Sequence, residues 1–222
     1  MIARCTRSFI RVPELAALAS AMIALAMSGC TPYPSWPSYN VAVSALAAEE
    51  SSQYSTVFII PGIEGVDEND LQYREYRKYM NRALEASGYT IEPDIESAEL
   101  AVSLYYEISD PKSNQTTKMK PVFGSNFSIQ GWVPTSSTYT TYLRYVHLTA
   151  VDMRKWTTSS EVYPVWETQI ISEGSSADMR KVFPVLAASG IHYYGSNSEG
   201  TRSFVISEGQ QSVIYVKGRN SY

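Results

Sequence analysis

Residues 71–89 read LQYREYRKYMNRALEASGY, and residues 98–108 read AELAVSLYYEI. The first stretch predicts an amphipathic helix over residues 71–87, because its apolar side chains recur at helical spacing (Tyr76, Tyr79, Met80, Ala83 and Leu84). Gly88 follows where a helix commonly ends. The second stretch alternates apolar and polar residues, which predicts a half-buried strand covered by that helix.

Further elements are predicted on both sides of this helix and strand. We expect strands over residues 56–61, 139–152, 162–172, 204–206 and 212–217, and a second helix over residues 177–189 that contains Pro184. The polar residues 154–160 predict a turn that joins two of these strands into an antiparallel hairpin. This order predicts a single α+β domain over residues 56–218, with a mostly antiparallel sheet and two helices packed on one face.

The segment at residues 109–138 breaks the pattern. It is rich in Thr, Ser and Asn and is predicted to be a long loop, which is usually a functional feature in a compact domain. Because the segment also carries Phe123, Phe127 and Trp132, we expect it to hold a small hairpin that packs as a flap and contacts a partner. Tyr193 and Tyr194 are the other candidate contact residues.

The N-terminus has the pattern of a bacterial lipoprotein signal over residues 1–29. Three arginines precede an apolar run at residues 15–27, and Ser28-Gly29-Cys30 follows. We expect cleavage between Gly29 and Cys30 and attachment of diacylglycerol and palmitate to Cys30. An ordinary signal peptide remains an alternative, whereas a retained anchor is disfavoured because the run is shorter than a bilayer span.

The residues after Cys30 predict an acylated, extended tether over residues 30–55. Three prolines lie within residues 32–37, which favours an extended chain. Thr31 stands where an Asp would retain many lipoproteins in the inner membrane, so we expect delivery to the outer membrane, facing the periplasm.

Composition excludes several classes of function. Without residues 1–29 the chain has 15 basic and 21 acidic side chains, which argues against nucleic acid or a generally anionic membrane surface as the partner. The two cysteines are Cys5 and Cys30, so an acylated mature chain has no thiol for a disulfide, a metal site or catalysis.

Catalytic signals are sparse. His147 and His192 are the two histidines, and no nucleophile elbow or phosphate-binding loop accompanies them. We therefore expect no catalytic residues, no metal site and no cofactor. The alternative is a hydrolase or glycan-active envelope enzyme that uses one of these histidines with a nearby carboxylate.

Several motifs together resemble a family of bacterial envelope lipoproteins, domain-of-unknown-function family 4136. They are Gly88-Tyr89 after the helix, Ala98-Glu99-Leu100, Val151-Asp152, Val165-Trp166 and Phe183-Pro184. The resemblance covers roughly residues 55–218 and differs at Glu99, where the family usually has Asp. It implies an α+β body and an outer-membrane address but no activity. We therefore expect a non-enzymatic lipoprotein, membrane-bound through its lipid, that binds an envelope protein or glycan.

Overall fold

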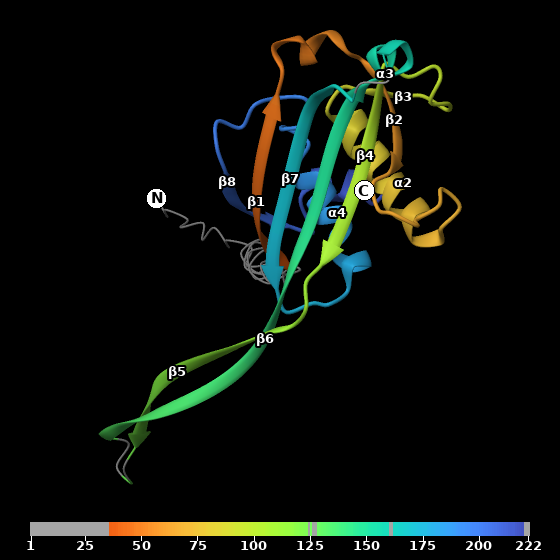
Figure 1. Cartoon of the computed structure of the whole chain (residues 1–222). Coiled ribbons are helices and arrows are strands. Elements are labelled where there is room, and N and C mark those ends of the chain that lie inside the picture. Colours follow the sequence, from red (N-terminus) through yellow and green to blue (C-terminus); the bar gives the residue numbers. More distant parts are fainter. Residues whose placement is uncertain (1–35, 124, 126–127, 160–161, 220–222) are drawn as a thin grey trace, which may run out of the picture. The chain divides into compact units, whose positions relative to one another are not determined.

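The computed structural model describes residues 36–123, 125, 128–159 and 162–219, and its secondary structure is dominated by strands (Figure 1). The strands are β1 (Ser38–Ala47), β2 (Thr56–Pro61), β3 (Thr90–Ile91), β4 (Leu100–Ile108), β5 (Lys112–Phe123), β6 (Ile129–Asp152), β7 (Pro164–Gly174) and β8 (Arg202–Ser207). The helices are α2 (Leu71–Ala86), α3 (Met153–Ser159), α4 (Met179–Ser189) and α5 (Gln211–Val216), with a short 3-10 helix, η1, at Glu49–Gln53.

The strands form one open, mixed sheet in the order β3-β2-β4-β6-β7-β1-β8, and β5 pairs with β6 outside this path. β2 runs parallel to β3 and β4, while the other pairs are antiparallel. The predicted hairpin between residues 139–152 and 162–172 is confirmed, since Tyr145 lies opposite Ile171. The mostly antiparallel α+β class is therefore correct.

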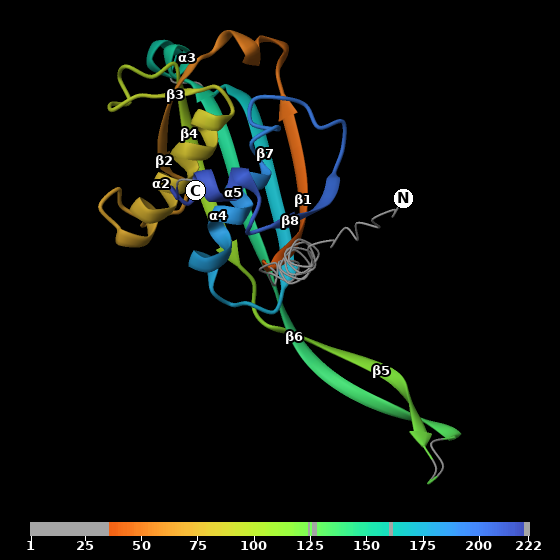
Figure 2. The same cartoon turned by 180° about the vertical axis from the view of Figure 1, so that it is seen from behind.

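Helices α2, α4 and α5 lie on one face of the sheet and leave the other face uncovered (Figure 2). Helix α2 forms as predicted: Asp70 accepts a hydrogen bond from the backbone N–H of Tyr73 at 2.8 Å, and Gly88 adopts a φ of 103° after the last turn. Its buried stripe is Tyr73, Tyr76, Met80, Ala83 and Leu84. The layer contains three helices rather than the predicted two.

Two terminal assignments were wrong. Residues 38–47, predicted as tether, form β1 in the sheet, because Val41, Val43 and Ala45 alternate with small or polar residues and face the helices. Residues 212–217, predicted as a strand, belong to α5, where Val213 and Val216 lie one turn apart and are buried.

Two connections also differ from the prediction. Residues 154–160 were predicted as a turn, but Met153–Ser159 is helix α3, capped by the Asp152 carboxylate. Residues 109–138 were predicted as a long loop that holds a small hairpin packed as a flap. A hairpin is present, but it is the long β5–β6 ribbon, which projects beyond the sheet instead of packing as a flap. Thr116 lies opposite Ser137 and Thr117 lies opposite Ser136 along that ribbon, and such hydroxyl-bearing cross-strand pairs favour a ladder over a loop.

Candidate functional site

The β5–β6 ribbon continues beyond the end of the sheet as an arm, which we define as residues 112–141 (Figure 1). β6 enters the sheet only at Tyr142, which lies opposite Gly174 of β7. Before that point β6 pairs with β5 alone, over Lys112–Phe123. The arm therefore has no second layer to bury its side chains.

Hydrogen bonds fix the root of the arm to the sheet. The amide of Asn114 donates to the hydroxyl of Thr141 at 2.8 Å, and that hydroxyl donates to Glu173 of β7 at 2.8 Å. On the other side, the backbone N–H of Ser109 donates to the carbonyl of Leu143 at 2.8 Å. These contacts hold the base of the arm in register with β6 and β7.

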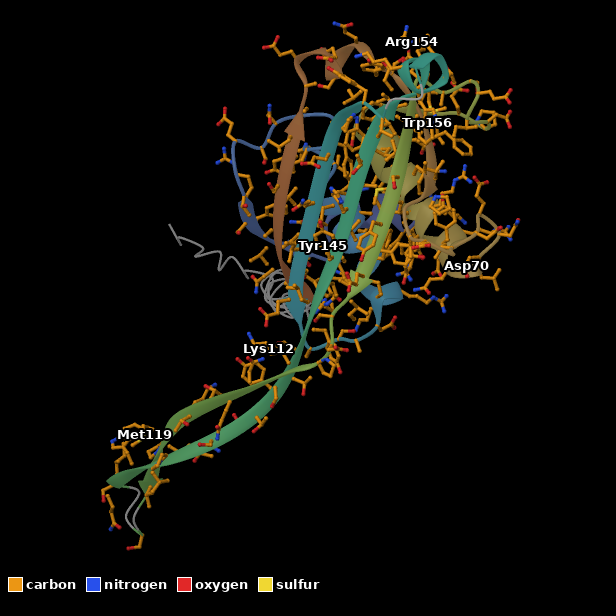
Figure 3. All side chains as sticks on the ribbon, in the orientation of Figure 1. Asp70, Lys112, Met119, Tyr145, Arg154 and Trp156 are labelled. Carbon is orange, nitrogen blue, oxygen red and sulfur yellow. The ribbon has the colours of Figure 1, made fainter. Side chains whose placement is uncertain are left out.

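The arm has two parts of different chemistry. The shaft, residues 112–117 and 135–141, is lined by Ser, Thr, Asn and Gln, with Thr117 and Ser136 hydrogen-bonded across it at 3.1 Å. The tip, residues 118–123, 125 and 128–134 of the described chain, exposes large apolar side chains to solvent. These are Met119 (56% exposed), Val122 (41%), Ile129 (54%), Trp132 (56%) and Val133 (47%). Figure 3 shows Lys112 at the root and Met119 near the far end.

The strand register separates the tip into two faces. Met119 lies opposite Pro134, and Pro121 lies opposite Trp132, so one face is apolar. Lys118 and Lys120 project from the other face because side chains alternate along a strand. Val133 lies opposite Lys120, so the lysine face also carries Val133 and Val122, and the tip as a whole is apolar with two lysines on one face.

The predicted contact residues divide between the arm and the core. Trp132 is exposed on the tip, and Phe123 is the last residue of β5. Phe127, Gly29 and Cys30 lie outside the described residues, so the predicted contact, cleavage and lipidation at these positions stay predictions.

Tyr194 was wrongly predicted as a contact residue, because it is 5% exposed and its hydroxyl donates to the carbonyl of Ala187 at 2.8 Å. Burial raises the pKa of its phenol. Tyr193 is half-buried and packs near Phe204, with ring centroids 6.5 Å apart. The apolar residues 119, 122 and 133, which complete the tip, were missed because the segment was not predicted to alternate.

The uncovered face of the sheet carries a smaller polar and aromatic cluster. His147 Nε2 lies 3.6 Å from Glu167 Oε2, and the His147 ring lies 6.0 Å from that of Tyr145. Tyr145 in turn packs edge-on against Tyr105, whose hydroxyl donates to Glu107 at 2.7 Å. Tyr145 is seen on this face in Figure 3. The cluster brings one candidate histidine to a carboxylate, while His192 lies elsewhere, exposed after α4.

Arg144 of β6 is a buried cation on the face of the sheet that the helices cover. It is 1% exposed, and its Nε and Nη1 atoms have no hydrogen-bond partner. Burial lowers the pKa of its guanidinium, and the neighbouring Tyr39 opposes that shift. Within the described residues, no three His, Cys, Asp or Glu side chains gather where they could hold a metal ion.

A shallow cavity of about 690 Å³ lies between α2 and residues 93–97. The Arg77 guanidinium sits 4.4 Å above the Phe58 ring in the cavity wall, and acidic residues of the loop complete that wall.

No helix among the described residues is long and apolar enough to cross a membrane.

Comparisons with known proteins give only distant similarities. No family model matches the chain, and no curated protein matches its sequence. Among solved structures, a PDZ domain protein from Parabacteroides distasonis matches with a TM-score of 0.41 and 15% identity. That match covers 87% of this chain, which spans only 43% of the PDZ domain protein.

Two further structures match over most of their own length. The PelC dodecamer from Paraburkholderia phytofirmans gives a TM-score of 0.40 and 13% identity, over 71% of this chain and 99% of PelC. A DUF4136 family protein from Bacteroides thetaiotaomicron gives 0.35 and 13%, over 70% of this chain and 97% of its own. The family suggested by the sequence motifs is thus represented among distant neighbours, and membership of this chain stays a prediction.

Proposed function

We propose that this protein is a non-enzymatic lipoprotein of the bacterial cell envelope, anchored in the outer membrane through a lipid on Cys30 and facing the periplasm. Its arm binds another component of the envelope. The anchor is supported by the basic, apolar and Ser28-Gly29-Cys30 pattern of residues 1–30. The binding role is supported by the arm, because an exposed apolar tip on a ribbon without a core has no function in folding.

The observation that carries the binding role is the exposure of Trp132 at the tip. An indole that is 56% exposed, with Met119 and Ile129 at similar exposures, forms an apolar patch at the end of a long projection, and Val122 and Val133 are exposed on the other face of the tip. Exposed apolar patches of this kind mark interaction sites. Trp is also among the residues most enriched in the energetic centres of interfaces.

Lipid attachment is tested by feeding cells a labelled palmitate and comparing the full chain with its Cys30→Ala variant. We expect label in the outer-membrane fraction for the parent and none for Cys30→Ala. Label on both forms, or on neither, would refute the anchor.

Binding through the arm is tested in intact cells by placing a photo-crosslinking amino acid at position 132 or at position 156. Trp156 is the matched control, because it is 42% exposed on α3, away from the arm. We expect a discrete crosslinked species from position 132 only. Equal yields from the two positions would show that the tip has no preferred contact.

A glycan-active or hydrolytic enzyme is the second candidate function, and the His147–Glu167 pair is the observation in its favour. Both residues lie on an open sheet face, and a carboxylate beside an imidazole is a usual acid–base arrangement. If this function holds, His147→Ala should abolish hydrolysis of purified cell-wall glycan by the mature chain. Absence of hydrolysis by the parent protein would remove this candidate.

A further inference from the structure

We infer that the tip of the arm binds the interfacial region of a phospholipid bilayer, the same bilayer that holds the lipid anchor. This inference rests on the proposed lipid anchor at Cys30 and names the chemistry of the component that the arm contacts. It is supported by the charge of the arm, by the side chains of its tip, and by the end of the sheet at which both the arm and β1 begin.

The arm is positively charged, although the net charge of the whole chain is negative. The chain has a net charge of −4, yet the segment from Pro111 to Val151 contains no Asp or Glu. Within it lie Lys112 at the root and Lys118 and Lys120 at the tip. In an acidic protein, a projection that carries lysines and no acidic residue is the part attracted to an anionic membrane. Each lysine close to an anionic membrane surface contributes about 1 kcal/mol to the binding free energy.

The tip also has the side chains of an interfacial anchor. Trp prefers the level of the lipid headgroups, where its ring is partly buried and its N–H remains hydrated. Trp132 is flanked in the tip by the apolar Met119 and Ile129, while Lys118 and Lys120 can extend their ammonium groups back to the phosphates. The face with Trp132 and Met119 suits the apolar side of the interface, while the two lysines lie on the face that also carries Val122 and Val133 and supply the charged groups for the phosphates.

The backbone of the arm limits how deeply it enters. Both edges of a two-stranded ribbon present unpaired N–H and C=O groups, and these are not tolerated in the hydrocarbon core. The tip therefore rests among headgroups and upper acyl chains rather than crossing the bilayer. Pro121 and Pro134 remove one outward N–H from each edge, which also disfavours pairing with a strand from a second copy.

The register places the root of the arm and the start of β1 at one end of the sheet. Val41 lies opposite Ser172, which lies opposite Arg144, so β1 begins level with the root of the arm. From Cys30 to Ser38 the chain can span at most about 28 Å even if fully extended. Residues 129–141 of β6 span roughly 40 Å at strand spacing. The arm is therefore longer than the connection to the lipid, and its tip can reach the bilayer that holds the anchor.

The inference is tested without the lipid, by co-sedimenting the chain that begins at Thr31 with vesicles of phosphatidylethanolamine and phosphatidylglycerol. This chain keeps the whole core cluster, whose residues all lie from Val41 to Val216. We expect it to bind these vesicles, and we expect brominated phospholipids to quench its fluorescence more than that of its Trp132→Phe variant.

Matched variants assign the binding to the tip. Lys118→Glu with Lys120→Glu, and separately Trp132→Ser, should each weaken vesicle binding by about tenfold or more. Lys78→Glu on α2 and Trp156→Ser on α3 change exposed residues away from the arm and should leave binding unchanged. Thermal unfolding of each variant shows that a lost signal reflects the tip and not the fold.

Three outcomes would overturn the inference: no vesicle binding by the parent chain, equal loss in the tip and control variants, or binding unaffected by the tip variants. Concentration-dependent self-association that Trp132→Ser abolishes, without vesicle binding, would instead assign the tip to a second copy of the chain. Because the palmitate experiment measures the anchor at Cys30 separately, failure of the anchor and failure of the tip are distinguishable.

Discussion

The rings of Tyr76 and Phe183 are stacked, with centroids 4.1 Å apart and planes 5° from parallel, and this contact joins α2 to α4. Tyr106 of β4 packs edge-on against both rings, at 4.8 Å from Tyr76 and 6.1 Å from Phe183. Three elements that are distant in sequence therefore meet in one aromatic cluster between the helices and the sheet.

Truncation of this cluster should destabilise the fold strongly. Phe183 is fully buried, so Phe183→Ala should lower the free energy of unfolding by about 3–5 kcal/mol through lost burial and the cavity left behind. Urea unfolding followed by circular dichroism gives this value. Trp156→Ala, on the exposed α3, is the control and should change it by less than about 0.5 kcal/mol. A small effect of Phe183→Ala would mean that the cluster is not a structural centre.

The sequence predicts the elements that carry these three aromatic residues, but it does not predict that the three rings contact one another. Tyr76 was predicted on the apolar face of its helix from helical spacing, which the structure confirms, and Phe183 and Tyr106 lie within the helix and the strand that were predicted over residues 177–189 and 98–108. Periodicity identifies a buried face but contains no information about which distant face it meets. Local capping was also predictable: Asp152 Oδ1 accepts a hydrogen bond from the backbone N–H of Arg154 at 2.8 Å, as a strand-ending Asp commonly does.

The arm and β1 were missed for a related reason. In the shaft, Thr and Ser face solvent on both sides, so no apolar alternation marks the strands, and pairing between β5 and β6 is what stabilises them. Residues 38–47 were assigned to the tether because prolines precede them, although alternating burial at Val41 and Val43 places them in the sheet. Tyr194 was predicted to lie at the surface because the local sequence does not distinguish a buried tyrosine from an exposed one.

Arg144 should be dispensable for stability. Its buried Nε and Nη1 have no partner, so Arg144→Met exchanges an uncompensated charge for an apolar side chain of similar length. We expect the free energy of unfolding to stay the same or to rise by about 1–3 kcal/mol, measured by urea unfolding. Arg180→Met, which removes an exposed ion pair with Glu75, should have almost no effect. A clear loss of stability in Arg144→Met would show that the guanidinium has a stabilising partner in solution.

The Glu208 carboxylate should make stability depend on acid pH. Glu208 accepts hydrogen bonds from Lys217 Nζ and the Tyr39 hydroxyl, each at 2.7 Å. Burial opposes its ionisation, but these two bonds outweigh burial and hold the pKa of Glu208 below its ordinary value. Because the pKa of Glu208 is lowered in the folded state, its ionised carboxylate stabilises the fold fully above the unfolded pKa of about 4.3. This stabilisation is lost as the pH falls through the pKa that Glu208 has in the folded state.

Glu208→Gln tests this dependence. At pH 7 the variant should be less stable than the parent by about 1–3 kcal/mol, because the charge-assisted bond to Lys217 is lost. The difference should shrink as pH falls below about 4, where the parent carboxyl also becomes neutral. Glu199→Gln is the control, since Glu199 is exposed in its ion pair and should show no such convergence. A difference that is constant from pH 7 to pH 3 would contradict the assignment.

The arm should be separable from the folding of the domain. Replacing residues 115–138 with Asn-Gly joins the paired residues Asn114 and Tyr139 through a two-residue hairpin turn. The root bond between Asn114 and Thr141, and that from Thr141 to Glu173, are retained. Because the removed residues belong to no layer of the core, the free energy of unfolding should change by less than about 1 kcal/mol in urea. A shorter replacement, of residues 118–135 with Asn-Gly between the paired residues Thr117 and Ser136, should give the same stability and keep most of the shaft. Loss of the folded state in both variants would show that the arm contributes to folding. Stable variants that no longer bind vesicles would assign vesicle binding to the removed part of the arm, and to the tip where the shorter variant also fails to bind.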